Sequence, residues 1–333
     1  MELTNEQRKY LGLELVEPNW ERVELPSNCL KPELSTGKNI LFFDGDVLRK
    51  VIFLYNYDSG FFSEDSYRLP TQDNRTMIAP LTKRGKPKRL NGVNIQRCTP
   101  YGVYVKYDGG TFRIANHTTQ QTYYSSAEEG IPPMEQGAFQ KFLDKWIKDT
   151  TDVDLADIQS FAHRKRKHCK YKEGDFFRFK YDRRNYGYGR ILLDVRKFIK
   201  DGGTFWDVLF GKPLCVSVYH IITENPNVSV EELQTLQSCP SQYIMDNRFF
   251  YGEYEIIGNA PAPENADYPI MYGRSIDYHD QNKICFCRGR EYREIPLEGN
   301  ELFPTDFSNK GIGFCVKADG NIAITVGQKN GNT

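Results

Sequence analysis

The sequence predicts an α+β, β-rich fold: two domains of short, twisted, mostly antiparallel strands with a few short helices and a helical connector. Its 333 residues exceed what one ordinary hydrophobic core organises and suit two. Tyr and Phe each occur 21 times, and aromatic side chains favour strands. The apolar spacing changes near mid-chain from alternation to a helical period and back. We therefore expect an N-terminal β-rich domain at residues 1–130, a helical connector at 131–170 and a C-terminal β-rich domain at 171–333.

Short strands and turns fill most of the predicted N-terminal domain. Thr4 and Gln7 form a capping-box pattern that opens a short helix. A long strand is predicted over Leu48–Tyr57. Gly102–Asn116 contains two alternating runs around Asp108-Gly109-Gly110, and this is the pattern of a β-hairpin.

The predicted connector contains two helices. In the first, over 136–150, apolar residues recur at spacings of 3, 4, 7 and 8 and share one face: Phe139, Phe142, Leu143, Trp146 and Ile147. The second covers 152–168. It has acidic residues at its start and basic residues at its end, as the helix dipole favours.

Strands return in the predicted C-terminal domain. Short helical segments are expected at 205–211 and 229–237, where Ser229 and Glu232 form a second capping-box pattern. Alternating or continuous apolar runs predict strands at 174–182, 186–198, 213–222, 249–259, 283–296 and 311–327.

The charge balance limits the classes of function. Lys and Arg number 44, and so do Asp and Glu, so the net charge is zero. Residues 1–166 hold 23 basic and 22 acidic side chains, so neither half is strongly charged. This balance argues against a protein whose main role is to coat nucleic acid, because such proteins carry a basic excess.

Two local basic runs are exceptions to this balance. One contains Lys83, Arg84, Lys86, Lys88 and Arg89, and the other is the segment 163–168. Their side chains fit phosphate contacts, but a solvated loop and a dipole-matched helix end explain them equally. A nucleic-acid-associated regulator that uses these runs therefore stays open as an alternative.

The sequence contains no pattern typical of a catalytic or metal site. The cysteines are scattered, and the close pair Cys285-x-Cys287 lacks the spacing and the second pair of ligands of a zinc site. The five histidines are isolated, and no G-x-S-x-G pattern occurs. Asp44 and Asp46 in D-G-D are more typical of a hairpin or bulge than of chelating acids. We expect no enzyme activity, metal or cofactor, with an enzyme of unrecognised type as a further alternative.

The sequence also predicts a location. No apolar run approaches the roughly 18 residues of a membrane-spanning helix, and the charged N-terminus is unlike a signal peptide. Scattered cysteines are typical of reduced thiols in a cytosolic protein. We therefore expect a cytoplasmic protein without a membrane partner.

The stretch from Tyr186 to Arg190 has an unusual strand pattern. Alternation places Tyr186, Tyr188 and Arg190 on one face, and Gly187 and Gly189 on the other. We expect the glycine face against the core, because Ile191 and Leu193 continue it. The tyrosine face is expected to be at least partly open, with Arg190 paired to Asp175 or Asp194. It either completes a bent sheet or contacts a partner.

These residues also carry a resemblance. Lys172-Glu-Gly-Asp-Phe-Phe, Asn185-Tyr-Gly-Tyr-Gly-Arg-Ile-Leu and Tyr254-Glu-Ile-Ile-Gly-Asn-Ala-Pro-Ala-Pro resemble immunity protein 26, a family of bacterial polymorphic toxin systems. The resemblance covers about residues 168–300. Its motif residues are Gly174, Asp175, Tyr186, Gly187, Tyr188, Gly189, Arg190, Ile257 and Gly258.

The resemblance implies a function as well as a fold. It implies an intracellular protein that binds a cognate protein toxin and blocks it by occlusion, which requires complementarity and no catalytic group. Among the motif residues, Tyr186, Tyr188 and Arg190 are the candidates for partner contact.

Overall fold

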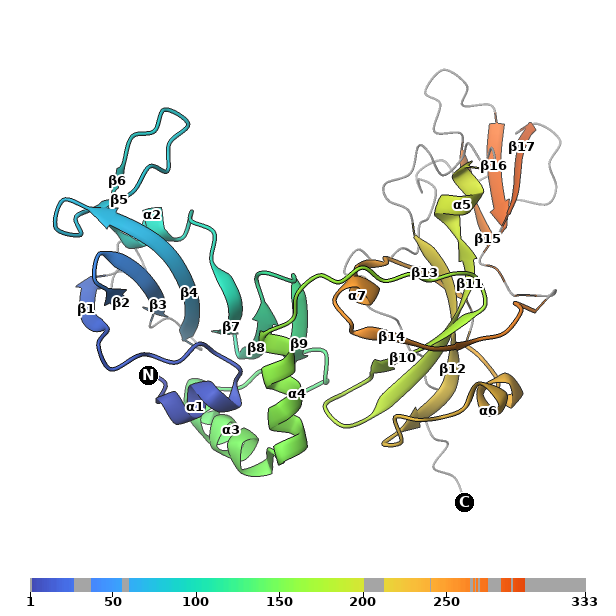
Figure 1. Cartoon of the computed structure of the whole chain (residues 1–333), viewed down its shortest axis with the longest axis horizontal. Coiled ribbons are helices and arrows are strands. Elements are labelled where there is room, and N and C mark those ends of the chain that lie inside the picture. Colours follow the sequence, from blue (N-terminus) through green and yellow to red (C-terminus); the bar gives the residue numbers. More distant parts are fainter. Residues whose placement is uncertain are drawn as a thin grey trace. The chain divides into compact units, whose positions relative to one another are not determined.

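The computed structural model describes residues 2–26, 37–55, 60–200, 213–239, 241–263, 266, 268, 270–274, 283–288 and 290–296. Strands contain 39% of the residues and helices 20%. These proportions confirm the predicted β-rich class (Figure 1). The chain divides into two compact units, Met1–Lys165 and Arg166–Thr333.

The first unit is built on one large antiparallel sheet. In its described part the strand order is β1-β2-β3-β4-β7-β8-β9, and β5 and β6 form a hairpin attached to β4. The strands are β1 (Glu21–Pro26), β2 (Lys38–Asp44), β3 (Val47–Tyr55), β4 (Phe61–Gln72), β5 (Met77–Ile78), β6 (Lys88–Arg89), β7 (Tyr101–Asp108), β8 (Thr111–Asn116) and β9 (Gln121–Ser125). The helices are α1 (Asn5–Tyr10), α2 (Gly92–Ile95), α3 (Gln136–Asp149) and α4 (Asp152–Ala162).

Both faces of this sheet are buried in part. In β2, Ile40 and Phe42 belong to one core and Leu41 and Phe43 to another, as the period of 2 requires. The first core also receives side chains of α3 and α4, among them Leu143, Trp146, Ile158 and Phe161. Figure 1 shows α1, α3 and α4 together on that side of the first unit's sheet. The two helices expected as a connector thus help to form the first unit's core.

The second unit contains two smaller antiparallel sheets within its described residues. One has the order β13-β12-β11-β10-β14 and the other β15-β16-β17. The strands are β10 (Asp175–Lys180), β11 (Tyr186–Asp194), β12 (Leu214–Thr223), β13 (Gln242–Ile244), β14 (Tyr254–Asn259), β15 (Ile270–Arg274), β16 (Lys283–Arg288) and β17 (Glu291–Pro296). The helices are α5 (Val195–Lys200), α6 (Val230–Thr235) and α7 (Asn247–Phe250).

Several local predictions are confirmed. Thr4 and Gln7 form a complete capping box at α1. The predicted hairpin is β7–β8, in which Asp108 lies opposite Thr111. Asp44 and Val47 close the β2–β3 hairpin, so the D-G-D segment is a turn.

Several element boundaries differ from the prediction. The predicted strand 186–198 ends at Asp194, because helix α5 begins at Val195. Helix α4 ends at Ala162 with His163 as its C-cap, so the basic run 163–168 lies outside the helix that was expected to include it. The predicted strand 249–259 begins only at Tyr254, because α7 and a turn at Gly252, where φ is +71°, come before it. The predicted elements at 205–211 and 311–327 lie outside the described residues.

Candidate functional site

The glycines of β11 accommodate aromatic rings of the neighbouring strand. Gly187 lies opposite Phe179 and Gly189 opposite Phe177 in the β10–β11 register. A Cβ atom at either glycine would lie 2.5 Å from the Cζ atom of the opposite ring, closer than any side chain permits. Both rings belong to a core that also contains Ile191. The glycine face of β11 therefore packs against the core through the rings of Phe177 and Phe179.

The tyrosine face of β11 is covered as well. Tyr188 is fully buried in a second core with Phe176, Tyr219, Val228 and Leu233. Its hydroxyl donates to the main-chain oxygen of Asn225 at 2.6 Å, and burial raises the pKa of the phenol. The expectation of a partly open face is therefore wrong at Tyr188, because Leu233 of α6 and the segment before that helix cover it. Tyr186, at the end of the strand, is half-buried.

Arg190 is also buried, and main-chain oxygens are its hydrogen-bond partners among the described residues. Its guanidinium donates to the carbonyl of Ala260 at 2.8 Å and to that of Pro261. It lies 4.6 Å from the ring centroid of Phe176. The predicted carboxylates have other partners: Asp175 accepts from Asn259 Nδ2 at 2.8 Å, and Asp194 pairs with Arg196 at 3.2 Å. Arg190 thus fixes the turn that follows β14.

The remaining family-motif positions also build the fold. Gly174 has φ of +88°, and a Cβ there would lie 2.3 Å from the oxygen of Ala260, so only glycine fits. A Cβ at Gly258 would lie 2.5 Å from Val230 Cγ2 of α6. Ile257 packs half-buried against the second core. Together these contacts join β10, β14 and α6.

A group of exposed and half-buried side chains lies where β10 turns into β11. We name it the hairpin tip: Lys180, Tyr181, Arg183, Arg184 and Tyr186. Tyr181 is 45% exposed and Arg184 is exposed as well. The ring of Tyr186 lies 4.4 Å from Lys180 Nζ and 5.9 Å from Arg178 Cζ. Among the family-motif residues, Tyr186 is the one that belongs to this tip.

Asp182 holds the hairpin tip in one shape. Its carboxylate accepts hydrogen bonds of 2.8 Å from the main-chain nitrogens of Arg184 and Asn185 and from Asn185 Nδ2. Burial acts to raise the pKa of this carboxyl, but the hydrogen bonds outweigh it and the pKa lies below its ordinary value. Sequence analysis missed the tip. The signal that could have found it is the turn composition Asp182–Asn185, between two alternating runs.

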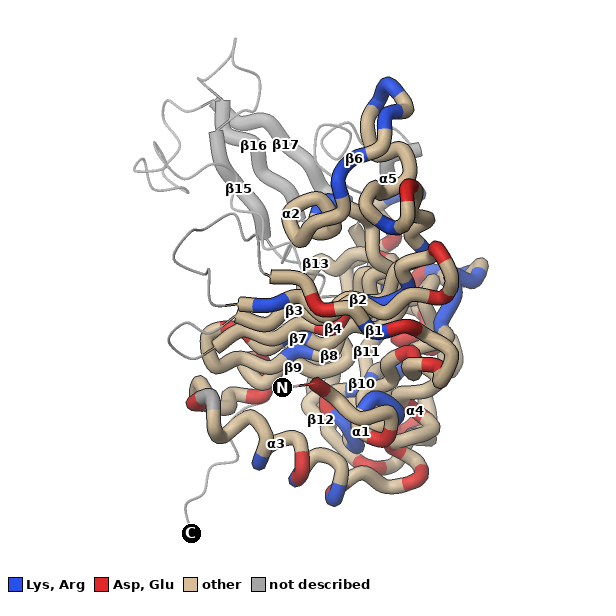
Figure 2. The backbone as a smooth tube through the Cα atoms, turned by 90° about the vertical axis from the view of Figure 1, so that its left-hand side faces the viewer, with Lys and Arg blue, Asp and Glu red and all other residues tan. Residues whose placement is uncertain are grey.

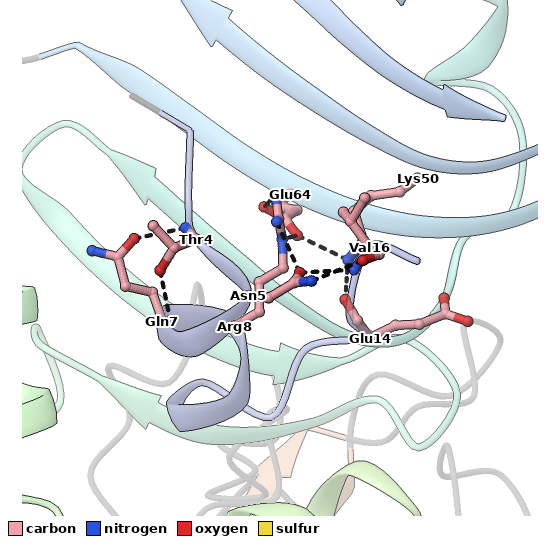
Figure 3. Close-up of polar contacts among 8 residues, drawn as sticks. All are labelled: Thr4, Asn5, Gln7, Arg8, Glu14, Val16, Lys50 and Glu64. Atoms are coloured by element: carbon pink, nitrogen blue, oxygen red, sulfur yellow. Dashed lines mark hydrogen bonds and ion pairs between the residues drawn. The ribbon is translucent and has the colours of Figure 1, made fainter. Parts of the chain in front are cut away.

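A cluster of buried charges lies in the first unit (Figure 3). Glu64 of β4 accepts from Arg8 Nε at 2.7 Å and from Lys50 Nζ at 2.8 Å. Lys50 also donates to the main-chain oxygen of Glu14 at 2.6 Å. Lys50 and Glu64 have no exposed side-chain surface, and Arg8 is 4% exposed. No substrate can reach these groups. Their contacts instead join α1 and the chain after it to the sheet.

One histidine of the first unit has an acidic partner. His117 Nε2 lies 2.7 Å from Asp65 Oδ1, and the imidazole stacks on Tyr104 with ring centroids 4.0 Å apart. The hydroxyl of Ser63 contacts the carboxylate of Asp65 at 3.1 Å, so it is bonded to the carboxylate and not to the histidine. A nucleophilic serine is typically activated by a histidine hydrogen-bonded to its hydroxyl, whereas the hydroxyl of Ser63 donates to Asp65.

Four of the described cysteines form no disulfide. Cys215 and Cys239 are buried, and Cys98 and Cys169 are half-buried. Cys239 Sγ lies 3.8 Å from His220 Nδ1, but burial raises the pKa of this thiol, which disfavours the reactive thiolate. In the described part of the chain, no group of three or more His, Cys, Asp or Glu side chains is placed to hold a metal ion. Cys285 and Cys287 lie on β16.

The two basic runs differ in their surroundings. Lys83, Arg84, Lys86 and Arg89 are exposed on the β5–β6 hairpin, and Lys88 is half-buried. The run 163–168 is extended: Arg164 lies 5.4 Å from the Phe161 ring and Arg166 lies 4.9 Å from the Phe250 ring. Among the described helices, none is long and apolar enough to cross a membrane.

Comparison with known families finds a match, and it lies within the second unit. The model of the family "Immunity protein 26" matches residues 172–283, the region that contains all nine motif residues. No curated protein and no solved structure matches the chain. The match confirms the resemblance seen in the sequence and covers the sheet that β11 organises. Residues 172–283 of this chain are thus similar to the immunity protein 26 family.

Proposed function

We propose that this chain is a cytoplasmic, non-catalytic immunity protein that binds a cognate protein toxin and neutralises it by occlusion. The observation that carries the proposal is the family match at residues 172–283. Occlusion needs a complementary surface and no reactive group. The buried family motif and the exposed hairpin tip fit this division of roles.

The hairpin tip is the surface that we assign to toxin contact. Tyr and Arg are enriched among binding hot spots, and the tip presents Tyr181 and Arg184 three residues apart in sequence, with Tyr186 nearby. The hydrogen bonds of Asp182 order the loop before any partner arrives, which lowers the entropic cost of association. The cations favour a toxin with an acidic face at its active site.

Among the three family-motif residues named as candidates for contact, Tyr188 and Arg190 take a supporting role in this proposal. Tyr188 has no exposed surface and Arg190 is 6% exposed, so a toxin can contact them only after the second unit opens. They hold the strand from which the tip projects. Tyr186 keeps its assignment as a contact residue.

The test uses, as the candidate toxin, the protein domain encoded by the reading frame next to the gene for this chain. Co-expression of the full-length chain should restore growth of cells that produce this domain, and the purified pair should form a 1:1 complex in titration calorimetry. The double variant Tyr181→Ala/Arg184→Ala should weaken binding and rescue. Lys170→Ala, which removes an exposed cation elsewhere in the same unit, should leave both unchanged.

The outcomes separate the parts of the proposal. If no neighbouring product binds the chain or harms growth, the immunity function is wrong. If the complex forms and the double variant binds as tightly as the wild type, the function stands and the tip is the wrong surface. If the toxin stays inactive after the immunity protein has been removed, the toxin was modified chemically and occlusion is wrong.

A further inference from the structure

The β5–β6 hairpin of the first unit carries a dense cluster of positive charge. Five cations occur between residues 83 and 89, and we name Lys83, Arg84, Lys86, Lys88 and Arg89 the basic hairpin. Figure 1 shows the hairpin projecting from the sheet beyond β4. Figure 2 shows basic positions at its outer end. A projecting loop can contact a partner without steric interference from the sheet.

No acidic residue balances these charges locally. From Asn74 to Tyr107 the sequence contains no Asp or Glu. Other cations of the unit do have carboxylate partners: Arg75 pairs with Glu21 at 2.5 Å, and Lys106 pairs with Asp108 at 2.8 Å. In the described residues, no ion pair involves a side chain of the basic hairpin. Its charges are therefore available to an external anion.

The hairpin is ordered by its own hydrogen bonds. Thr82 Oγ1 accepts from the main-chain nitrogen of Lys86 at 2.7 Å, and Gly85 donates to the oxygen of Thr82 at 2.9 Å. At its base, Asn94 Nδ2 donates to the oxygen of Arg89 at 2.8 Å. The main chain that carries the cations is thus fixed before binding, which reduces the ordering cost of a complex.

The composition of the hairpin points to phosphate more than to a protein surface. Protein interfaces centre on buried aromatic or other large apolar anchors. None of the large exposed hydrophobic side chains among the described residues, Leu15, Val153 and Tyr181, lies on this hairpin. Phosphate binding needs only correctly spaced cations, and it supplies most of the affinity for nucleic acid without reading its sequence.

We propose that the basic hairpin binds the phosphate backbone of nucleic acid in a sequence-independent manner. This activity is additional to toxin binding and resides in the unit that the family match does not cover. The zero net charge of the chain confines binding to this local surface. The first unit thereby places the chain on an anionic polymer while the second unit remains free to bind its toxin.

Fluorescence anisotropy on the full-length chain with a 20-base-pair mixed-sequence DNA duplex tests the proposal. With about four phosphates neutralised, log K should fall against log salt concentration with a slope of roughly −3.6, so affinity should drop about 10²-fold between 50 and 200 mM salt. The variant Lys83→Gln/Arg84→Gln/Lys86→Gln/Arg89→Gln should lose at least about tenfold in affinity at 50 mM salt, and its slope should approach zero.

A charge-matched variant provides the control. Lys9→Gln/Lys141→Gln/Lys145→Gln/Lys148→Gln removes four exposed cations from α1 and α3 of the same unit. It should bind the duplex like the wild type, and both variants should unfold at the wild-type temperature. Equal losses in the two variants, or no binding by the wild type at 50 mM salt, would overturn the proposal. Binding of poly-L-glutamate as tightly as the duplex would also overturn it and would assign the hairpin to an acidic protein.

Discussion

The two units bury polar side chains in different ways. The first unit buries a cluster of three charged groups, Arg8, Lys50 and Glu64, which neutralise one another in part. The second unit buries a neutral phenol, Tyr188, and a guanidinium, Arg190, which donate to main-chain oxygens. Removing one member of the cluster in the first unit leaves an uncompensated buried charge. Removing the donor in the second unit leaves an unpaired carbonyl oxygen, which costs less.

The difference also separates structure from function. Neither the Arg8–Lys50–Glu64 cluster nor the pair Tyr188 and Arg190 is accessible to a partner. Tyr188 and Arg190 are nevertheless among the residues that identify the family. The candidates for partner contact lie on loops: the basic hairpin in the first unit and the hairpin tip in the second. This agrees with the general rule that binding residues lie on loops positioned by a rigid scaffold. Mutations in the buried groups should therefore change stability, and mutations in the loops should change binding.

The largest effect is expected for Glu64→Ala. The change leaves Arg8 and Lys50 buried together without their carboxylate, and such a loss costs about 3–5 kcal/mol of unfolding free energy. Urea denaturation measures it. Glu21→Ala is the control, because Glu21 is 61% exposed in its ion pair with Arg75 and should cost under about 1 kcal/mol. Similar costs for the two variants would contradict the contrast between buried and exposed pairs.

The next effect is expected for Gly189→Val. A side chain there must displace the ring of Phe177 and meets the main-chain oxygen of Ser217, 2.9 Å from the Cβ position. Overpacking of this kind costs about 1–3 kcal/mol. Gly137→Val places the same side chain in open space and should change stability by less than about 0.5 kcal/mol. A Gly189→Val protein as stable as the wild type would show that Phe177 can move without cost.

The sequence predicts the faces of β11 but not what covers them. Alternation placed Gly187 and Gly189 with Ile191, and the structure agrees. The opposite face is closed by Leu233 and Val228, which lie about forty residues later, and no local pattern can report such a contact. The alternation of side chains therefore identified the face that packs on the core. The prediction that Tyr188 is partly exposed was wrong.

The buried charges show a second limit of sequence reasoning. Lys50 and Glu64 occur inside apolar strand sequences, where alternation alone suggests a solvent-exposed position. Their partner Arg8 is 56 residues from Glu64, so the neutralising contact depends on the tertiary fold. The hairpin tip, by contrast, had a local signal in Asp182–Asn185. The basic hairpin was visible directly as a charge run, which needs no tertiary information.

A smaller effect is expected for Tyr188→Phe. The change removes the hydroxyl that donates to Asn225 and leaves its carbonyl unpaired, so it should cost about 0.5–1.5 kcal/mol. Thermal and urea unfolding should both report the loss, while toxin affinity of the folded protein stays constant. Tyr186→Phe at the half-buried end of the same face should cost less than about 0.5 kcal/mol. A loss of toxin affinity in Tyr188→Phe without a loss of stability would return Tyr188 to the contact surface.

The smallest effect on stability, and the largest on binding, is expected for Tyr181→Ala. Tyr181 is 45% exposed, and surface substitutions of this kind stay within about ±0.5 kcal/mol. Toxin affinity should nevertheless fall about 30-fold or more, which corresponds to the roughly 2 kcal/mol of a hot spot. Tyr188→Ala should give the reverse pattern, with a lower melting temperature and unchanged affinity once folded. Calorimetric titration and thermal unfolding of both variants compare the two residues directly. If Tyr181→Ala destabilises the protein as much as Tyr188→Ala does, the tip supports the fold as the strand does, and the toxin must bind elsewhere on the second unit.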